Sequence, residues 1–258
     1  MSAFDRARFL ALCRERGVGL GEPLSAVAQT GSTNDDAMEA ARSGAPHGAT
    51  FVADAQTRGR GRRGARWTSP PGENLLCSVL LRPELSAERA GTLTLAVGLA
   101  VRDVVARRVT GAVRVKWPND VLVGDAKLAG ILLESQLEAG RVSALVIGVG
   151  LNVAMRELPS ELRGIATSLA LEGDPDPSRE EVLVELLAAL ERRLAVHLRD
   201  GLRPVLDELR SCDALLGRRV RVDHVTGTAA GIAADGALVV RADDGEEAHV
   251  RSGGVELV

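Results

Sequence analysis

Residues 116–132 read KWPNDVLVGDAKLAGIL, and predicted helices and strands lie on both sides of this segment. The pentapeptide at 116–120 carries a lysine, an asparagine and an aspartate between apolar runs that predict strands at 112–116 and 128–137. Ligand groups often stand at strand ends, where these three side chains can handle a metal-bound triphosphate and its neighbouring carboxylate. A plain hairpin turn with surface lysines is the alternative, and it suits Lys127 taken alone better than it suits the pentapeptide.

Hydrophobic periodicity predicts a mixed order of helices and strands on both sides of this segment. A continuous apolar stripe over 86–108 favours one helix lying on the sheet. The expected helices are 3–16, 32–43, 86–108 and 178–198, and the expected strands are 24–30, 50–55, 74–81, 112–116, 128–137 and 142–149. Such an order predicts the α+β class, with a mixed sheet.

The pattern of apolar and polar residues changes after Cys212. Short alternating runs at 218–222, 226–233, 238–242 and 247–250 are separated by glycine and aspartate turns. This pattern is typical of a small all-β barrel. We therefore expect a large domain at 1–212 and a small one at 213–258.

Composition excludes several classes of protein. A formal net charge of −3 gives no overall attraction to nucleic acid or to an anionic membrane. No apolar run approaches the roughly 20 residues of a membrane span, and the charged start MSAFDRARFL does not resemble a signal peptide. Cys13, Cys77 and Cys212 form no C-x-x-C pair, so we expect buried thiols and neither a disulfide nor a zinc site. The chain is expected to be cytoplasmic.

Residues 56–67, QTRGRGRRGARW, place five arginines among three glycines. Glycines let backbone amides approach an anion, and arginine forks bind phosphate oxygens, so the segment suits a loop that orders around a phosphate ester. Ordering about ten residues costs on the order of 10 kcal/mol, which the ligand must offset. A solvated basic loop or a nucleic-acid contact explains the composition equally well.

Two further motifs are weaker when taken singly. Ser32, Thr33 and Asn34 offer donors and acceptors at a helix start, where helix capping already explains them. Residues 148–153, GVGLNV, end a predicted strand with two glycines and an amide, and a glycine pair usually marks a turn or a bulge.

In chain order, these motifs resemble the motif series of the biotin protein ligases. The resemblance rests on residues 32–34, 59–64 with Trp67, 116–120, 127–132 and 148–153. It extends from about residue 25 to the C-terminus, because residues 213–258 are similar to the small SH3-like domain of that family.

The resemblance implies a two-step reaction. Biotin and ATP, with Mg²⁺, form biotinyl-5′-adenylate, and biotin then passes to a lysine of a biotin carboxyl carrier protein. The implied biotin contacts are Ser32, Thr33, Asn34, Gln56, Arg60, Gly61, Arg62 and Lys127. The implied ATP and adenylate contacts are Arg60, Arg62, Trp67, Asn119, Lys127 and Asn152, with Lys127, Arg62 and Asp120 catalytic. No magnesium ligand is assigned.

Three other functions stay open at this point. A lipoate ligase would share the core and the adenylation chemistry, a nucleic-acid-binding protein would use the arginines, and a silent sensor would have lost a catalytic group. Only about 24 residues precede the first predicted core strand, too few for the helix-turn-helix domain of the family's repressor members. We therefore expect no DNA operator binding.

Overall fold

The computed structural model describes residues 3–258 apart from the side chain of Glu88, so Met1 and Ser2 of the charged start lie outside it. Seven strands form one sheet in the order β1-β2-β3-β7-β6-β5-β4. β1 and β2 run parallel and all other neighbours run antiparallel, which makes the sheet mixed. The strands are β1 Leu24–Thr30, β2 Thr50–Gln56, β3 Leu75–Leu81, β4 Val113–Lys116, β5 Asp120–Val123, β6 Ala126–Glu138 and β7 Arg141–Leu151.

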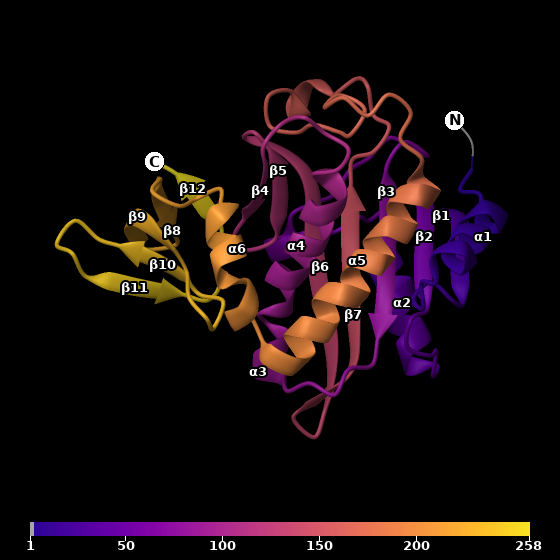
Figure 1. The fold of residues 1–258 in the computed structure, drawn as a ribbon, viewed down its shortest axis with the longest axis horizontal. Coiled ribbons are helices and arrows are strands. Elements are labelled where there is room, and N and C mark those ends of the chain that lie inside the picture. Colours follow the sequence, from indigo (N-terminus) through magenta and orange to yellow (C-terminus); the bar gives the residue numbers. More distant parts are fainter. Residues whose placement is uncertain (1–2) are drawn as a thin grey trace.

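Helices cover both faces of this sheet (Figure 1). Side chains alternate along a strand, so Val79 and Ile147 join the core beneath α4 and α5, whereas Leu80 and Val146 pack with α2 on the opposite face. The helices are α1 Arg6–Arg16, α2 Thr33–Arg42, α3 Ala87–Ala90, α4 Leu93–Val105, α5 Arg179–Asp200 and α6 Leu206–Ser211. Short 3-10 helices lie at η1 Arg62–Gly64, η2 Ser160–Leu162 and η3 Arg203–Val205.

The C-terminal residues form a second, five-stranded antiparallel sheet in the order β11-β10-β9-β8-β12. Its strands are β8 Arg219–Val222, β9 Val225–Ile232, β10 Leu238–Arg241, β11 Glu247–Val250 and β12 Val255–Leu257. The core of this sheet is continuous with Leu99 of α4 and with Trp117, whose Nε1 donates to the Gly236 carbonyl at 2.9 Å. The second sheet is therefore packed against the end of the first near β4 (Figure 1).

The predicted α+β class, with a mixed sheet and a small all-β C-terminal part, is confirmed. The single helix predicted over 86–108 is wrong, because α3 ends before Gly91 and α4 begins at Leu93. Between them the Thr92 hydroxyl donates to the Arg89 carbonyl at 2.9 Å. The prediction also missed β5, whose three consecutive apolar residues show no alternation, and β12, which has only three residues. The domain division at 212 and 213 stays a prediction.

Two expectations drawn from composition can be compared with this fold. Among residues 3–258, no helix is both long and apolar enough to cross a membrane. Cys13, Cys77 and Cys212 are free and buried, as predicted.

Candidate functional site

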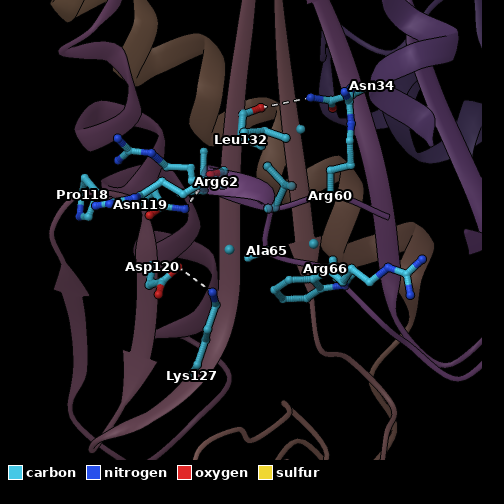
Figure 2. A pocket seen from close by; sticks show the side chains of 18 of the residues that line it. Asn34, Arg60, Arg62, Ala65, Arg66, Pro118, Asn119, Asp120, Lys127 and Leu132 are labelled. Carbon is cyan, nitrogen blue, oxygen red and sulfur yellow. Dashed lines mark hydrogen bonds and ion pairs between the residues drawn. The ribbon is translucent and has the colours of Figure 1, made fainter. Parts of the chain in front are cut away.

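A cavity of about 250 Å³ lies where β6 and β7 meet the start of α2, the arginine-rich loop and the turn between β4 and β5. Figure 2 shows arginine, lysine and amide side chains of these segments gathered around it. The predicted site residues among its lining are Ser32, Thr33, Asn34, Gln56, Arg60, Gly61, Arg62, Trp67, Asn119, Asp120 and Lys127. Segments almost 100 residues apart in the sequence therefore converge on one space.

A hydrogen-bonded cluster forms one side of the cavity. The Gln56 Oε1 accepts from the Thr33 amide at 2.7 Å. The Ser78 hydroxyl of β3 lies 2.8 Å from the Thr33 Oγ1 and 2.6 Å from the Asn34 Oδ1. The Asn34 Nδ2 donates to the Glu134 carboxylate at 2.7 Å. These contacts orient the side chains before any ligand arrives.

Ser32 precedes the first residue of α2, but its side chain makes no capping hydrogen bond. Capping therefore does not account for this residue, although the sequence alone allowed it. Ser32 is 3% exposed and lines the cavity, so its hydroxyl is available to a ligand there.

Glycines bring this polar cluster and an indole ring close to the sheet. A Cβ on Gly148 would stand 2.1 Å from the Asn34 Oδ1, and one on Gly150 would stand 2.5 Å from the Trp67 ring. A Cβ on Gly130 would meet the same ring at 2.8 Å. The glycines of β6 and β7 thus make room for side chains that reach over the sheet.

Lys127 and Asp120 form an ion pair at the start of β6, with Nζ and Oδ1 2.7 Å apart. The Lys127 Nζ also lies 5.4 Å from the centroid of the Trp67 ring, within the range of a cation–π contact. Asn119 is held to β6 by its Nδ2, which donates to the Ile131 carbonyl at 2.9 Å. The turn after β4 is therefore both a hairpin connection and a cluster of polar groups facing the cavity.

The arginine-rich loop is a short hydrogen-bonded hairpin, a feature that its glycine-rich sequence did not predict. The Gly61 amide donates to the Ala65 carbonyl at 2.7 Å. Arg60 contacts the carboxylates of Asp35 at 2.6 Å and Glu134 at 3.0 Å, both outside the loop. These pairs hold cationic groups at the cavity without any acidic residue in the loop itself.

Arg62 extends from this loop towards the KWPND turn. Burial lowers the pKa of its guanidinium from the ordinary value, the negative charge of Asp120 raises it, and neighbouring Arg63 lowers it again. A guanidinium stays charged under these influences, so Arg62 provides a partly desolvated positive charge at the cavity.

Cys77 lies in the same lining but has no nucleophilic role there. Burial raises the pKa of its thiol to about 12, which keeps it protonated at neutral pH. Within residues 3–258, no three histidine, cysteine, aspartate or glutamate side chains come together in a group able to hold a metal ion.

Asn152 is the one predicted site residue outside the cavity lining. It is 5% exposed, and its Nδ2 donates to the Thr167 carbonyl at 2.8 Å. Its predicted contact with adenine stays a prediction.

Several residues of the site were not predicted from the sequence. Ser78 is the only polar side chain in the strand LLCSVLL, a signal that was available but unused. Glu134 gave no local signal, and Gly253 and Gly254 reach the cavity only because the second sheet packs against the first.

Comparisons with known proteins agree with this geometry. Residues 27–152 match the biotin/lipoate A/B protein ligase family, and residues 215–258 match the biotin protein ligase C-terminal domain. The chain is 38% identical over 231 residues to the biotin–[acetyl-CoA-carboxylase] ligase of Mycobacterium tuberculosis, which covers 86% of this chain and 84% of that relative. It is 34% identical over 232 residues to the bifunctional ligase/repressor BirA of Bacillus subtilis, covering 88% of this chain and 71% of BirA.

A solved structure shares most of this arrangement. The Aquifex aeolicus biotin protein ligase in complex with biotin and ATP superposes with a TM-score of 0.78 at 28% identity. The match covers 92% of this chain and 99% of that one.

Proposed function

Because this chain belongs to the biotin protein ligase family, we propose that its cavity joins biotin to ATP and then transfers biotin to a lysine of a biotin carboxyl carrier protein. The observation that carries the proposal is the convergence of a buried polar cluster, four arginines and the Lys127–Asp120 pair on one cavity. The polar cluster suits an uncharged polar ring, and the cations suit an adenylate.

In the first step an oxygen of the biotin carboxylate attacks the α-phosphorus of ATP. The new phosphorus–oxygen bond forms as the bond to pyrophosphate breaks, which yields biotinyl-5′-adenylate. Negative charge builds on the phosphoryl oxygens during this displacement, and nearby fixed cations stabilise it. Lys127 and Arg62 line the cavity and supply that charge, and Asp120 positions Lys127 at 2.7 Å.

The opposite side of the cavity accounts for the choice of substrate. Ser32, Thr33, Asn34 and Gln56 present hydroxyl and amide groups that can pair with the donors and acceptors of the biotin ring. A ligand without those groups would form none of these hydrogen bonds, each of which contributes roughly 0.5–1.5 kcal/mol. Lipoate has an apolar dithiolane ring and therefore fits this side poorly.

In the second step the lysine amine of the carrier attacks the acyl carbon of the adenylate. The amide bond forms as the bond to the AMP oxygen breaks, AMP leaves with that electron pair, and the amine loses a proton to solvent. Trp67 lies beside Lys127 and is proposed to close over the adenylate, with Asn119 holding the nucleotide side.

Magnesium is proposed to enter with the triphosphate. Mg²⁺ commonly binds through phosphate oxygens, water and one or two carboxylates, without a dedicated protein cage. Among the described residues that line the cavity, Asp120 is the carboxylate that fits this pattern. We also propose a cytoplasmic location, since three free thiols suit a reducing compartment.

The test is to mix the protein with magnesium ATP and either biotin or lipoate, without a carrier, and to identify the retained acyl adenylate by mass spectrometry. We expect biotinyl adenylate alone. Lipoyl adenylate would assign the protein to the lipoate ligases instead. If neither adenylate forms, a sensor or a nucleic-acid-binding protein is favoured.

A further inference from the structure

The carboxylate of Glu134 on β6 joins the buried polar cluster to the arginine-rich loop. Its Oε2 accepts from the Asn34 Nδ2 at 2.7 Å and from the Arg60 Nη2 at 3.0 Å. Asp35 closes a ring, because it follows Asn34 in the first turn of α2 and its Oδ1 lies 2.6 Å from the same Arg60 nitrogen. Glu134 lines a second cavity, of about 350 Å³, and is not part of the lining of the first. It can therefore act on a ligand of the first cavity only through its neighbours.

The two partners of Glu134 differ in how firmly they are held. Asn34 is 4% exposed, and its Oδ1 lies 2.6 Å from the Ser78 hydroxyl, so its amide is fixed on both sides. The side chain of Arg60 is 43% exposed and stands on a loop that is rich in glycine. Glu134, with a side chain that is 31% exposed, lies between them. A buried amide thus fixes a carboxylate, and that carboxylate contacts a mobile cation.

The guanidinium of Arg60 uses one nitrogen for both carboxylates, because Asp35 and Glu134 each contact Nη2. Among the residues that the structure describes, none is a partner of its Nε or Nη1. Asp35 is 45% exposed and has no buried anchor of this kind, so an incoming phosphate can displace it. Glu134 stays bonded to Asn34 and keeps its contact with Nη2. The other N–H groups of Arg60 are then free to donate to oxygens of an anion in the first cavity.

We propose that Glu134 is a positioning residue, which aligns Arg60 with the phosphate of the adenylate by tying it to the Asn34 amide. This inference rests on the proposed function. Glycines leave the backbone of the arginine-rich loop many conformations, so the loop by itself would not hold the Arg60 guanidinium in one place. The bond to Glu134 selects one position and links it to the cluster that receives biotin. Glu134 therefore contributes to retention of the adenylate without touching it.

The main test uses Glu134→Gln, because an amide oxygen still accepts from Asn34 but carries no charge to hold Arg60. Glu134→Ala removes both bonds. Glu138→Gln is the matched control, since Glu138 lies on the same strand, is exposed and accepts from Gln136 at 3.1 Å. For each variant we measure the KM for biotin in adenylate formation and the rate at which biotinyl adenylate is released. The release rate is also measured in Arg60→Ala, with and without Glu134→Gln.

We expect Glu134→Gln to release the adenylate about three- to fivefold faster, as for one partly exposed ion pair, while the KM for biotin changes less than about twofold. Glu134→Ala should also raise the KM for biotin, because the Asn34 amide loses its acceptor. Glu138→Gln should change neither quantity. Asp35→Asn should accelerate release less than Glu134→Gln does, since the phosphate displaces that contact. In Arg60→Ala, adding Glu134→Gln should have no further effect, because the two residues act as a unit.

Other outcomes separate the two proposals. If the unaltered protein makes no biotinyl adenylate, the proposed function fails. If it does, and Glu134→Gln releases the adenylate at an unaltered or slower rate, the positioning role is overturned. The same holds if Glu134→Gln accelerates release equally in Arg60→Ala, or if Glu138→Gln or Asp35→Asn has as large an effect. A Glu134→Gln protein that makes no adenylate, or whose KM for biotin rises as much as its release rate, would assign Glu134 to the integrity of the whole site and would also overturn the proposal.

Discussion

The two sides of the first cavity are built differently. On the sheet side, Thr33, Asn34 and Ser78 are at most 4% exposed and bond to one another. On the loop side, the side chains of Arg60 and Arg63 are 43% and 58% exposed and pair with carboxylates on other segments. Exposed pairs contribute about 0–1 kcal/mol each, so a ligand phosphate can displace them. The sheet side is therefore preorganised for recognition, and the loop side can rearrange around charge.

The largest effect is expected at Lys127, the cation that β6 contributes to the cavity. Lys127→Ala removes positive charge where negative charge develops, so adenylate formation should slow by about 10²- to 10³-fold. Rapid-quench measurement of biotinyl adenylate checks this, and Lys127→Arg should retain part of the rate because it keeps the charge. A change below threefold in Lys127→Ala would contradict the role assigned to this residue.

The second expectation compares one glycine from each side. A Cβ on Gly148 would overlap the Asn34 Oδ1 at 2.1 Å, whereas one on Gly61 would meet only ordinary contacts from 3.4 Å. Gly148→Ala should therefore lower the free energy of unfolding by about 1–3 kcal/mol and weaken biotin binding. Gly61→Ala should leave the stability nearly unchanged. Urea denaturation and calorimetric titration with biotin test both, and equal stability losses would remove the contrast between the two sides.

The third expectation concerns retention of the intermediate by the loop. Arg62→Ala should release biotinyl adenylate about tenfold faster, which corresponds to about 1.4 kcal/mol of lost interaction. Chasing radiolabelled adenylate with unlabelled biotin measures the rate. An unaltered release rate would show that the loop does not retain the adenylate.

The smallest expected effect is that of salt. Raising sodium chloride from about 0.05 M to about 0.5 M shortens the screening length to a few ångströms and weakens exposed charge interactions more than buried ones. Adenylate release should then accelerate by about two- to fivefold, while the dissociation constant for biotin changes by a smaller factor. Equal salt sensitivity of the two would indicate that the sheet side also depends on exposed charge.

Local pattern was enough to predict most of the fold. Alternating or 3.6-residue periodicity identified the strand at 24–30, the long helix after residue 178 and the change of texture after Cys212. It failed at β5, whose three consecutive apolar residues show no alternation, and at Gly91 and Thr92, which separate α3 from α4 within one apolar stripe.

The sequence by itself determined which chemical groups the protein carries and the order in which they occur: the polar triplet, the arginine-rich loop, KWPND and Lys127. Only the tertiary structure decided which of them meet. Ser78 and Glu134 reach Asn34 because strand order brings β3 and β6 to the start of α2. Asn152 instead turns to Thr167, away from the cavity lining. These contacts depend on packing between segments that are distant in the sequence, and no local sequence pattern encodes them.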